Sequence, residues 1–195
     1  MPEIKNPIVL SDDSTNKIKA ITSRPDFNHT LWSSDELESV RAEIRNFYRR
    51  EQGLSCAFCL SPVSERSALG AHVEHIAPKS IYPHFMFEPK NLCVVCPDCN
   101  EYKRDREVIA DKAIKTAAKR KYPESKDKFR IYHPHYDDYG RNIKKAGRLY
   151  FELTPEGGYI IYICNLNRFI QTFGVSEELL NSFATQLEAE SFHRG

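Results

Sequence analysis

The chain has no apolar run that approaches the roughly 18 residues a membrane-spanning helix needs. Its first residues, M-P-E-I-K-N-P, contain no apolar segment of the kind found in secretory signal peptides. It also has almost no net charge, because 28 Lys and Arg face 27 Asp and Glu and leave a formal charge of +1. We therefore expect a cytoplasmic protein with no membrane partner, in which any contact with nucleic acid depends on a local cluster of charge.

Cysteine is present in an informative pattern. Thiols stay reduced in the cytoplasm, where paired C-x-x-C units more often bind metal than form disulfides. Cys56 and Cys59 form one such pair, and Cys96 and Cys99 form a second. Two C-x-x-C turns supply four thiolates, the tetrahedral shell that a structural zinc prefers. The sequence therefore predicts a zinc site at these four residues, with disulfides or unligated buried thiols as the alternatives.

Two further cysteines need a separate interpretation. Cys93 offers an alternative pair with Cys96, because C-V-V-C has the same spacing. We prefer the pair Cys96 and Cys99, because P-D suits a turn whereas L-C-V-V is typical of an apolar strand. Cys164 stands alone in a strand-like run and is expected to be buried.

The segment between the two cysteine pairs predicts a compact order of elements. Residues 71–76, A-H-V-E-H-I, are expected to form a short strand that Pro78 ends. A loop over 77–90 follows, and N-L-C-V-V at 91–95 is expected to return as a second strand. A helix is expected from Asn100 onward. The zinc would join the start of this strand–loop–strand–helix unit to its end.

The ordered motifs C-x-x-C, E-H-I-x-P-K-S, N-L and C-x-x-C-N-x-x-K, from Cys56 to Lys103, resemble the HNH endonuclease family. The resemblance implies a ββα-metal core with a four-Cys structural zinc. The expected fold class is therefore α+β, with this core flanked by helices and by a small C-terminal α+β lobe. The activity that the resemblance implies is metal-dependent hydrolysis of DNA phosphodiester bonds.

The resemblance also implies roles for individual residues. His75 matches the general base, and a neutral imidazole with a pKa near ~6.5 can take a proton from water at neutral pH. Glu74 and Asn100 match the ligands of a catalytic Mg²⁺ or Mn²⁺, for which carboxylate and amide oxygens are suitable donors. Asn91 matches the middle residue of the family name, with the implied role of bracing the loop. Glu74 departs from the Asp that is more common there.

Other polar residues near this centre are open to two interpretations. His72 shares a strand face with Glu74, and we favour a hydrogen-bonded histidine at the edge of the site over a metal or substrate contact. Lys79 and Lys103 are candidates for contacts with backbone phosphates, with a solvated lysine as the alternative. From 103 to 130 the chain carries eleven cations against five acids, which predicts sequence-independent DNA binding beside the site rather than an ordinary charged helix. The proposed contacts include Lys119, Arg120 and Lys121.

The flanking segments complete the expected organisation. Residues 1–32 are expected to be an N-terminal arm or extended wrap, with a short helix around Ile18 and Ile21 as the alternative. Residues 33–128 are expected to form the nuclease core with its basic helix. Its first helix should open at Ser33, with Glu36 at capping-box spacing, and stop at Gly53. The apolar face of that helix would comprise Leu37, Val40, Ile44, Phe47 and Tyr48.

Residues 129–195 are expected to form a C-terminal lobe of a hairpin and a helix. Residues 149–153 and 159–164 look like strands on either side of T-P-E-G-G. Ser176 would open the last helix. The motifs H-P-x-x-D-D-Y and L-N-R loosely resemble Septu-type HNH nucleases of bacterial anti-phage defence, which implies an ATPase subunit as a partner. The apolar face of the last helix would comprise Leu179, Leu180, Phe183 and Leu187.

Two questions stay open at this point. A second metal site at His133, His135, Asp137 and Asp138 competes with a structural turn, and we favour the turn because the spacing is not that of a metal-binding turn. The chain could also be a catalytically silent, zinc-stabilised nucleic-acid- or protein-binding subunit, or a nuclease active only with its ATPase partner. The joint presence of Glu74, His75 and Asn100 argues against the silent module, because binding alone requires none of them.

Overall fold

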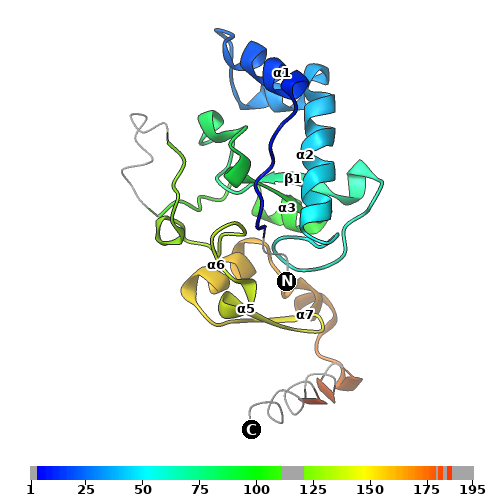
Figure 1. The fold of residues 1–195 in the computed structure, drawn as a ribbon. Helices are drawn as coiled ribbons and strands as arrows, with labels where there is room; N and C mark the ends of the chain where they lie inside the picture. The colour runs from blue at the N-terminus through cyan, green and yellow to red at the C-terminus, as the bar shows by residue number, and fades with distance from the viewer. Residues whose placement is uncertain (1–3, 111–120, 179, 182–183, 186–195) are drawn as a thin grey trace.

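The computed structural model describes residues 4–110, 121–178, 180–181 and 184–185. Within these residues the protein is α+β, with six α-helices and two small antiparallel sheets of two strands each (Figure 1). Buried apolar side chains from Ile4 to Leu166 form one contiguous core. Among the described helices, none has the length and apolar character required to cross a membrane.

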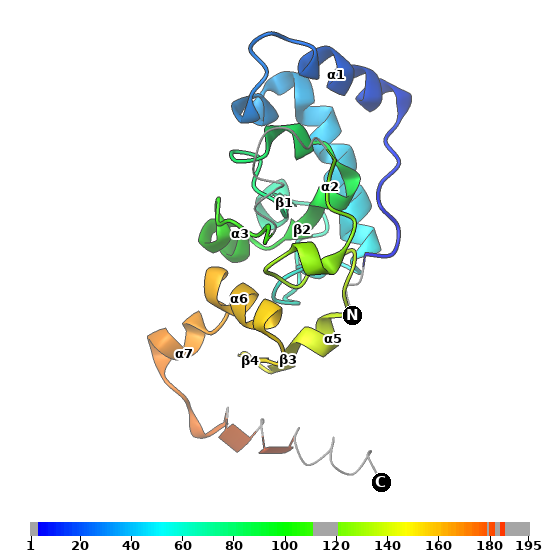
Figure 2. The same ribbon diagram turned by 90° about the vertical axis from the view of Figure 1, so that its left-hand side faces the viewer.

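The N-terminal arm combines both of the forms that the sequence allows. Residues 4–10 run extended beside helix α2, and helix α1 (Asp12–Thr22) follows them (Figures 1 and 2). Ile4, Ile8 and Ile21 are buried in the core, so the arm is held by apolar contacts. Ser11 caps α1 by accepting a hydrogen bond from the backbone N–H of Ser14. The short helix that we treated as the alternative is therefore present.

Helix α2 (Glu38–Glu51) confirms the first predicted helix, although it begins later than expected. Its buried residues are Val40, Ile44, Tyr48 and Arg49. Ser33, the predicted cap, is instead the last residue of a 3₁₀ turn, η1 (His29–Ser33), and a second 3₁₀ turn, η2 (Asp35–Leu37), leads into α2. The predicted capping box is thus not formed, because the chain enters the helix through this tighter turn.

The centre of the molecule is a strand–loop–strand–helix unit, as predicted. Strand β1 (His72–His75) pairs antiparallel with β2 (Leu92–Val95), and helix α3 (Pro97–Lys103) follows at once. In this register Glu74 lies opposite Cys93 and His75 opposite Leu92. Helix α2 contacts both strands, so the sheet rests on its buried face.

The C-terminal lobe differs from the expected hairpin and helix. A hairpin does form, but from β3 (Ile143–Ala146) and β4 (Leu149–Glu152). Residues 155–163, expected to include a strand, are helix α6 (Pro155–Ile163). Thr154 caps this helix through the N–H of Gly157, and Pro155 occupies its first turn. Our interpretation of T-P-E-G-G as a hairpin turn is wrong, because it is a helix start.

Helix α6 packs closely on helix α5 (Tyr139–Asn142), and Gly157 makes this possible. A Cβ at Gly157 would lie 2.0 Å from the carbonyl oxygen of Asn142. Cys164 is buried directly after α6, as expected, but at a helix end rather than in a strand. Helix α7 (Arg168–Phe173) follows. Leu179, Phe183 and Leu187 lie outside the described residues, and Leu180 is exposed.

Candidate functional site

The four predicted zinc ligands lie together. Cys56 and Cys59 belong to a turn after α2, Cys96 precedes α3, and Cys99 lies in the first turn of α3. Their sulfur atoms all lie within 4.8 Å of one another, and all four residues are buried. The Sγ atoms of Cys59 and Cys96 are 3.7 Å apart. Four sulfurs at about 2.3 Å from one zinc ion would be about 3.8 Å apart, so the cluster fits a zinc ion.

Backbone contacts fix the first cysteine turn against the central sheet. The N–H of Ala57 donates to the carbonyl of Val94 in β2 at 3.0 Å, and the N–H of Cys56 donates to Ser61 at 2.9 Å. Hydrogen bonds from the neighbouring thiols of the cluster lower the pKa of Cys59, which favours the thiolate that binds metal. Cys93 is not part of the cluster, which confirms the preference for Cys96 and Cys99 as the second pair.

Three of the four predicted catalytic residues, Glu74, His75 and Asn100, border one pocket of about 490 Å³, here named the β1–α3 pocket, whereas Asn91 does not line it. Strand β1 supplies Glu74 and His75, the following loop supplies Lys79, and α3 supplies Asn100. Asn100 is far from Glu74 and His75 in sequence. It lies near them in the fold because the antiparallel pairing of β1 with β2 brings α3 beside β1. His72 does not line the pocket. Its Nε2 lies 3.1 Å from the carbonyl oxygen of Leu69, as expected for a histidine at the edge of the site.

His75 is held in a defined orientation at the wall of this pocket. Its Nε2 lies 3.1 Å from the carbonyl oxygen of Met86, and Trp32 packs edge-on against its ring with centroids 4.5 Å apart. A carbonyl oxygen only accepts, so Nε2 carries the proton of the neutral ring and Nδ1 carries the lone pair. Burial, followed by the charge of Lys79, lowers the pKa of His75 well below its ordinary value.

Glu74 forms a buried ion pair with Lys103. The Nζ of Lys103 lies 2.5 Å from Glu74 Oε1 and donates to the carbonyl of His75 at 3.0 Å. Lys103 is 0% exposed and Glu74 is 6% exposed. Burial raises the pKa of Glu74, and Lys103 opposes that shift. The prediction that Lys103 contacts a DNA phosphate is wrong in this structure, because its charge is buried against Glu74.

Asn91 ties the two ends of the loop between the strands. Its Oδ1 accepts from the N–H of Ala77 at 2.6 Å. Its Nδ2 donates to the carbonyl oxygens of Ala77 at 3.1 Å and Phe85 at 2.9 Å. Asn91 is fully buried, so three hydrogen bonds satisfy a side chain that would otherwise be costly to bury. Through these bonds it positions the loop that carries Met86, the partner of His75.

The structure describes only some of the basic residues that are predicted to contact DNA. Lys119 and Arg120 lie outside the described residues, whereas Lys121 is exposed with its Nζ 3.3 Å from Glu124. Ile109, which lies in the segment expected to be the basic helix, instead forms an isolated bridge with Phe129. The side chain of Lys79 is the one predicted phosphate contact that lines the β1–α3 pocket among the described residues.

The histidines near residue 135 have structural partners. His133 Nε2 lies 2.9 Å from the hydroxyl of Tyr122, and His135 Nε2 lies 2.8 Å from the carbonyl of Leu92. Asp138 caps α5, and its backbone N–H donates to Asp137. Among the described residues these side chains do not form a cluster that could hold a metal. The expected structural turn is present, because the backbone N–H groups of Tyr136 and Asp137 both donate to the carbonyl of His133 at 3.0 Å.

Sequence reasoning missed two contributors to the site. Trp32 comes from the N-terminal arm, and no motif indicated that it would pack on His75. The burial of Lys103 did have a signal, because it lies four residues after Cys99, a predicted zinc ligand, and therefore on the same buried helix face. No protein-family model matches the chain, and no curated protein matches it. The case for a function therefore depends on residues and geometry.

Proposed function

We propose that the protein is a zinc-stabilised, metal-dependent HNH-type endonuclease that hydrolyses DNA phosphodiester bonds. One observation carries this proposal: Glu74, His75 and Asn100 border a single pocket on the strand–strand–helix unit that holds the four-Cys cluster. A binding module needs a stable fold and surface charge, but it needs no buried acid and imidazole side by side in a pocket.

His75 is the proposed general base. Its protonated Nε2 is engaged with Met86, so Nδ1 is the atom that accepts a proton from the attacking water. The lowered pKa keeps the imidazole neutral at physiological pH, so the base is ready without prior deprotonation. Trp32 and the Met86 carbonyl fix the ring, which reduces the reorganisation needed at the moment of reaction.

Glu74 and Asn100 are the residues that would hold a catalytic Mg²⁺ or Mn²⁺ in the β1–α3 pocket. Both side chains offer oxygen donors, and they come from two different elements that line that pocket, β1 and α3. Lys103 occupies Glu74 Oε1, so Oε2 is the oxygen left to face a cation. When bound, such a cation stabilises negative charge on the scissile phosphate and on the leaving oxygen.

DNA is the proposed substrate on the basis of the HNH-like motifs, and Lys79 in the pocket can contact a phosphate next to the cleaved one. Glu101 and Asp105 also line the pocket, and Arg104 pairs with Glu101, so Lys79 is the cation we assign to this contact. A role in bacterial anti-phage defence, with an ATPase subunit as partner, extends this proposal on the basis of the C-terminal motifs H-P-x-x-D-D-Y and L-N-R. Copurification with an ATPase from the native host tests that extension.

The decisive experiment is nicking of supercoiled plasmid with Mg²⁺ by wild type, His75→Ala and His72→Ala. His75→Ala removes the base and should lower the rate by roughly 10²–10⁴-fold, the usual contribution of general-base catalysis. His72→Ala is the matched control, because His72 is on the same strand but outside the pocket. Full activity in His75→Ala would remove the mechanism, and an inactive wild type would favour a binding subunit or a partner-dependent nuclease.

Glu74→Ala and Asn100→Ala separate the base from the metal ligands in the same assay. Each removes an oxygen donor, so the loss should be partly recovered at higher Mg²⁺ or Mn²⁺ concentration. The loss in Asn100→Ala should be smaller, because an amide carries no charge. His75→Ala should show no such recovery. If metal concentration rescues all three variants equally, the division of roles is wrong.

A further inference from the structure

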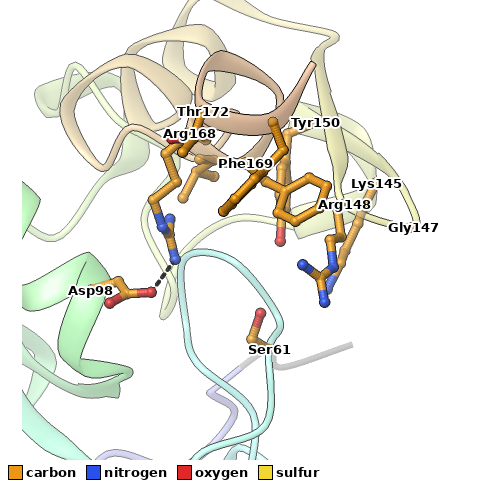
Figure 3. A pocket seen from close by; sticks show the side chains of 11 residues that line it. Ser61, Asp98, Lys145, Gly147, Arg148, Tyr150, Arg168, Phe169 and Thr172 are labelled. Atoms are coloured by element: carbon orange, nitrogen blue, oxygen red, sulfur yellow. Dashed lines mark hydrogen bonds and ion pairs between the residues drawn. The ribbon is translucent and has the colours of Figure 1, made fainter. Parts of the chain in front are cut away.

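A second pocket borders the same helix α3 and is not explained by the proposed chemistry. This α7 pocket, also about 490 Å³, is formed by the first cysteine turn, the start of α3, the β3–β4 hairpin and α7 (Figure 3). Asp98 of α3 lines it, whereas Asn100 and Glu101 of the same helix line the β1–α3 pocket. No zinc-ligand or proposed catalytic side chain lines the α7 pocket.

The α7 pocket has a surplus of positive charge. Three cations, Lys145, Arg148 and Arg168, face one carboxylate, that of Asp98. Arg168 pairs with Asp98 at 2.6 Å, and Lys145 Nζ donates to the carbonyl of Cys59 at 3.0 Å. Arg148 is exposed, and Figure 3 shows its guanidinium beside the Lys145 ammonium. Arg148 therefore presents its guanidinium to the pocket, which suits an anionic group such as a phosphate.

The same pocket also offers a flat surface for a base. The guanidinium of Arg148 lies over the ring of Phe169, with its carbon 4.2 Å from the ring centroid. Phe173, 72% exposed, lies next to Phe169 with ring centroids 4.9 Å apart. Nucleic-acid bases stack on guanidinium planes and aromatic rings, provided that the bases are unpaired. A phosphate site beside a stacking surface matches the two chemical parts of one nucleotide.

We propose that the α7 pocket binds an unpaired nucleotide of the DNA strand that the protein cleaves. This inference rests on the proposed function for the identity of the strand. Helix α3 provides the connection, because Tyr102 is 42% exposed on it and the guanidinium carbon of Arg168 lies 5.6 Å from the Tyr102 ring. Tyr102 contacts Arg168, and Arg168 is adjacent in sequence to Phe169, on which Arg148 lies, so side-chain contacts connect α3 to the stacking surface of the α7 pocket. The preferred substrate is therefore DNA with a single-stranded segment beside the cleavage site.

Fluorescence anisotropy with a labelled DNA single strand and a blunt duplex of the same sequence, without added Mg²⁺, tests the proposal. Arg148→Glu should raise the Kd for the single strand by roughly tenfold and lower the salt dependence by about one phosphate contact. Phe169→Leu should raise the Kd for the single strand by roughly five- to tenfold and leave the blunt duplex unchanged, because only unpaired bases stack. Arg141→Glu is the matched control, since Arg141 is an exposed arginine of α5 outside the pocket.

The outcomes separate this site from the proposed activity. If wild type nicks plasmid but Arg148→Glu binds single strands like wild type, the α7 pocket is rejected and the nuclease stands. If the protein cleaves nothing yet binds single strands through Arg148 and Phe169, the pocket stands and the nuclease is rejected. Equal weakening by Arg141→Glu and Arg148→Glu would show a diffuse charge effect and overturn the site. Competition by a deoxynucleoside monophosphate as effective as the strand would identify a free nucleotide as the ligand instead.

Discussion

The two pockets that border α3 differ in the burial of the charged side chains to which we assign a role. In the β1–α3 pocket, Glu74 and His75 are almost completely buried, and Lys103 is fully buried behind them. In the α7 pocket, Arg148 is exposed and lies flat on Phe169. Burial shifts the pKa values of side chains and restricts their conformations, which suits a reaction. An exposed cation can contact an anion with little change in its pKa or conformation. We infer that one pocket is built for a reaction and the other for binding.

The four-Cys cluster fixes the start of α3, the helix that borders both pockets. Its loss should therefore have the largest effect. Cys99 lies in α3 between Asp98, which lines the α7 pocket, and Asn100, which lines the β1–α3 pocket. Cys56→Ser should abolish stoichiometric zinc and destabilise the fold by several kcal/mol, because a closed zinc site contributes on the order of 10 kcal/mol. Zinc content by elemental analysis and the melting temperature are the measurements.

Cys93→Ser is the matched control for that substitution. Cys93 is as buried as Cys56 but lies in β2 outside the cluster. It should keep its zinc and show the milder loss of one polar substitution in the core, of about 1–3 kcal/mol. Pure, folded wild type without zinc would contradict the assignment. If both pockets kept their function after zinc loss, the cluster would not be their common support.

Sequence reasoning did well where chemistry restricts residue type and spacing. The C-x-x-C pairs and the E-H motif predicted the cluster, both strands and α3, because metal ligands and short strands leave local signatures. It failed at residues 155–163, where the run Y-I-I-Y-I suits a strand by propensity. There a helix forms instead, because Thr154 caps it and Pro155 occupies its first turn. The close approach of Gly157 to Asn142 also favours the helix, and this tertiary contact leaves no signal in the local sequence.

The same contrast explains which parts of the sites were found. His75 and Glu74 were predicted because they are adjacent in a motif, whereas Trp32 and Met86 reach His75 only through the fold. The α7 pocket was missed altogether. Its three cations come from β3, from the turn after β3 and from α7, so no single stretch of sequence contains all of them.

The buried ion pair of the β1–α3 pocket should produce the next largest effect. Lys103→Met removes the ammonium and leaves Glu74 buried without its cation, which should cost about 3–5 kcal/mol in free energy of unfolding. The double variant Glu74→Gln/Lys103→Met removes both charges and should recover most of that loss. Urea denaturation of the two variants measures the difference. Equal stabilities would show that the pair is not energetically coupled.

Arg168→Met provides the corresponding test in the α7 pocket. Arg168 also pairs with a carboxylate, but the side chain of its partner Asp98 is 62% exposed. Water can solvate that carboxylate once the arginine is gone, so the loss should be below about 1 kcal/mol. A loss as large as that of Lys103→Met would remove the distinction between a buried and an exposed pair. The distinction would become stronger if only the Lys103 variant also lost its metal-dependent activity.

The last expected effect is a dependence of stability on pH that comes from His135, which contacts the central sheet. Burial lowers the pKa of His135 to about 4, below its ordinary 6.5, while its ring contacts Leu92 of β2. Between these values the unfolded chain binds a proton that the folded chain does not, so stability falls as pH drops from 6.5 toward 4. The difference between these two pKa values corresponds to at most about 3.4 kcal/mol. His135→Gln keeps a donor for the Leu92 carbonyl but cannot titrate, so its stability should fall less over this range.

Acid release of zinc affects both proteins alike, so the difference between their urea midpoints isolates the contribution of the histidine. Arg148→Ala should leave the pH profile unchanged, since an arginine stays charged throughout. If His135→Gln follows the wild-type profile instead, His135 does not account for the loss of stability of the wild type in acid.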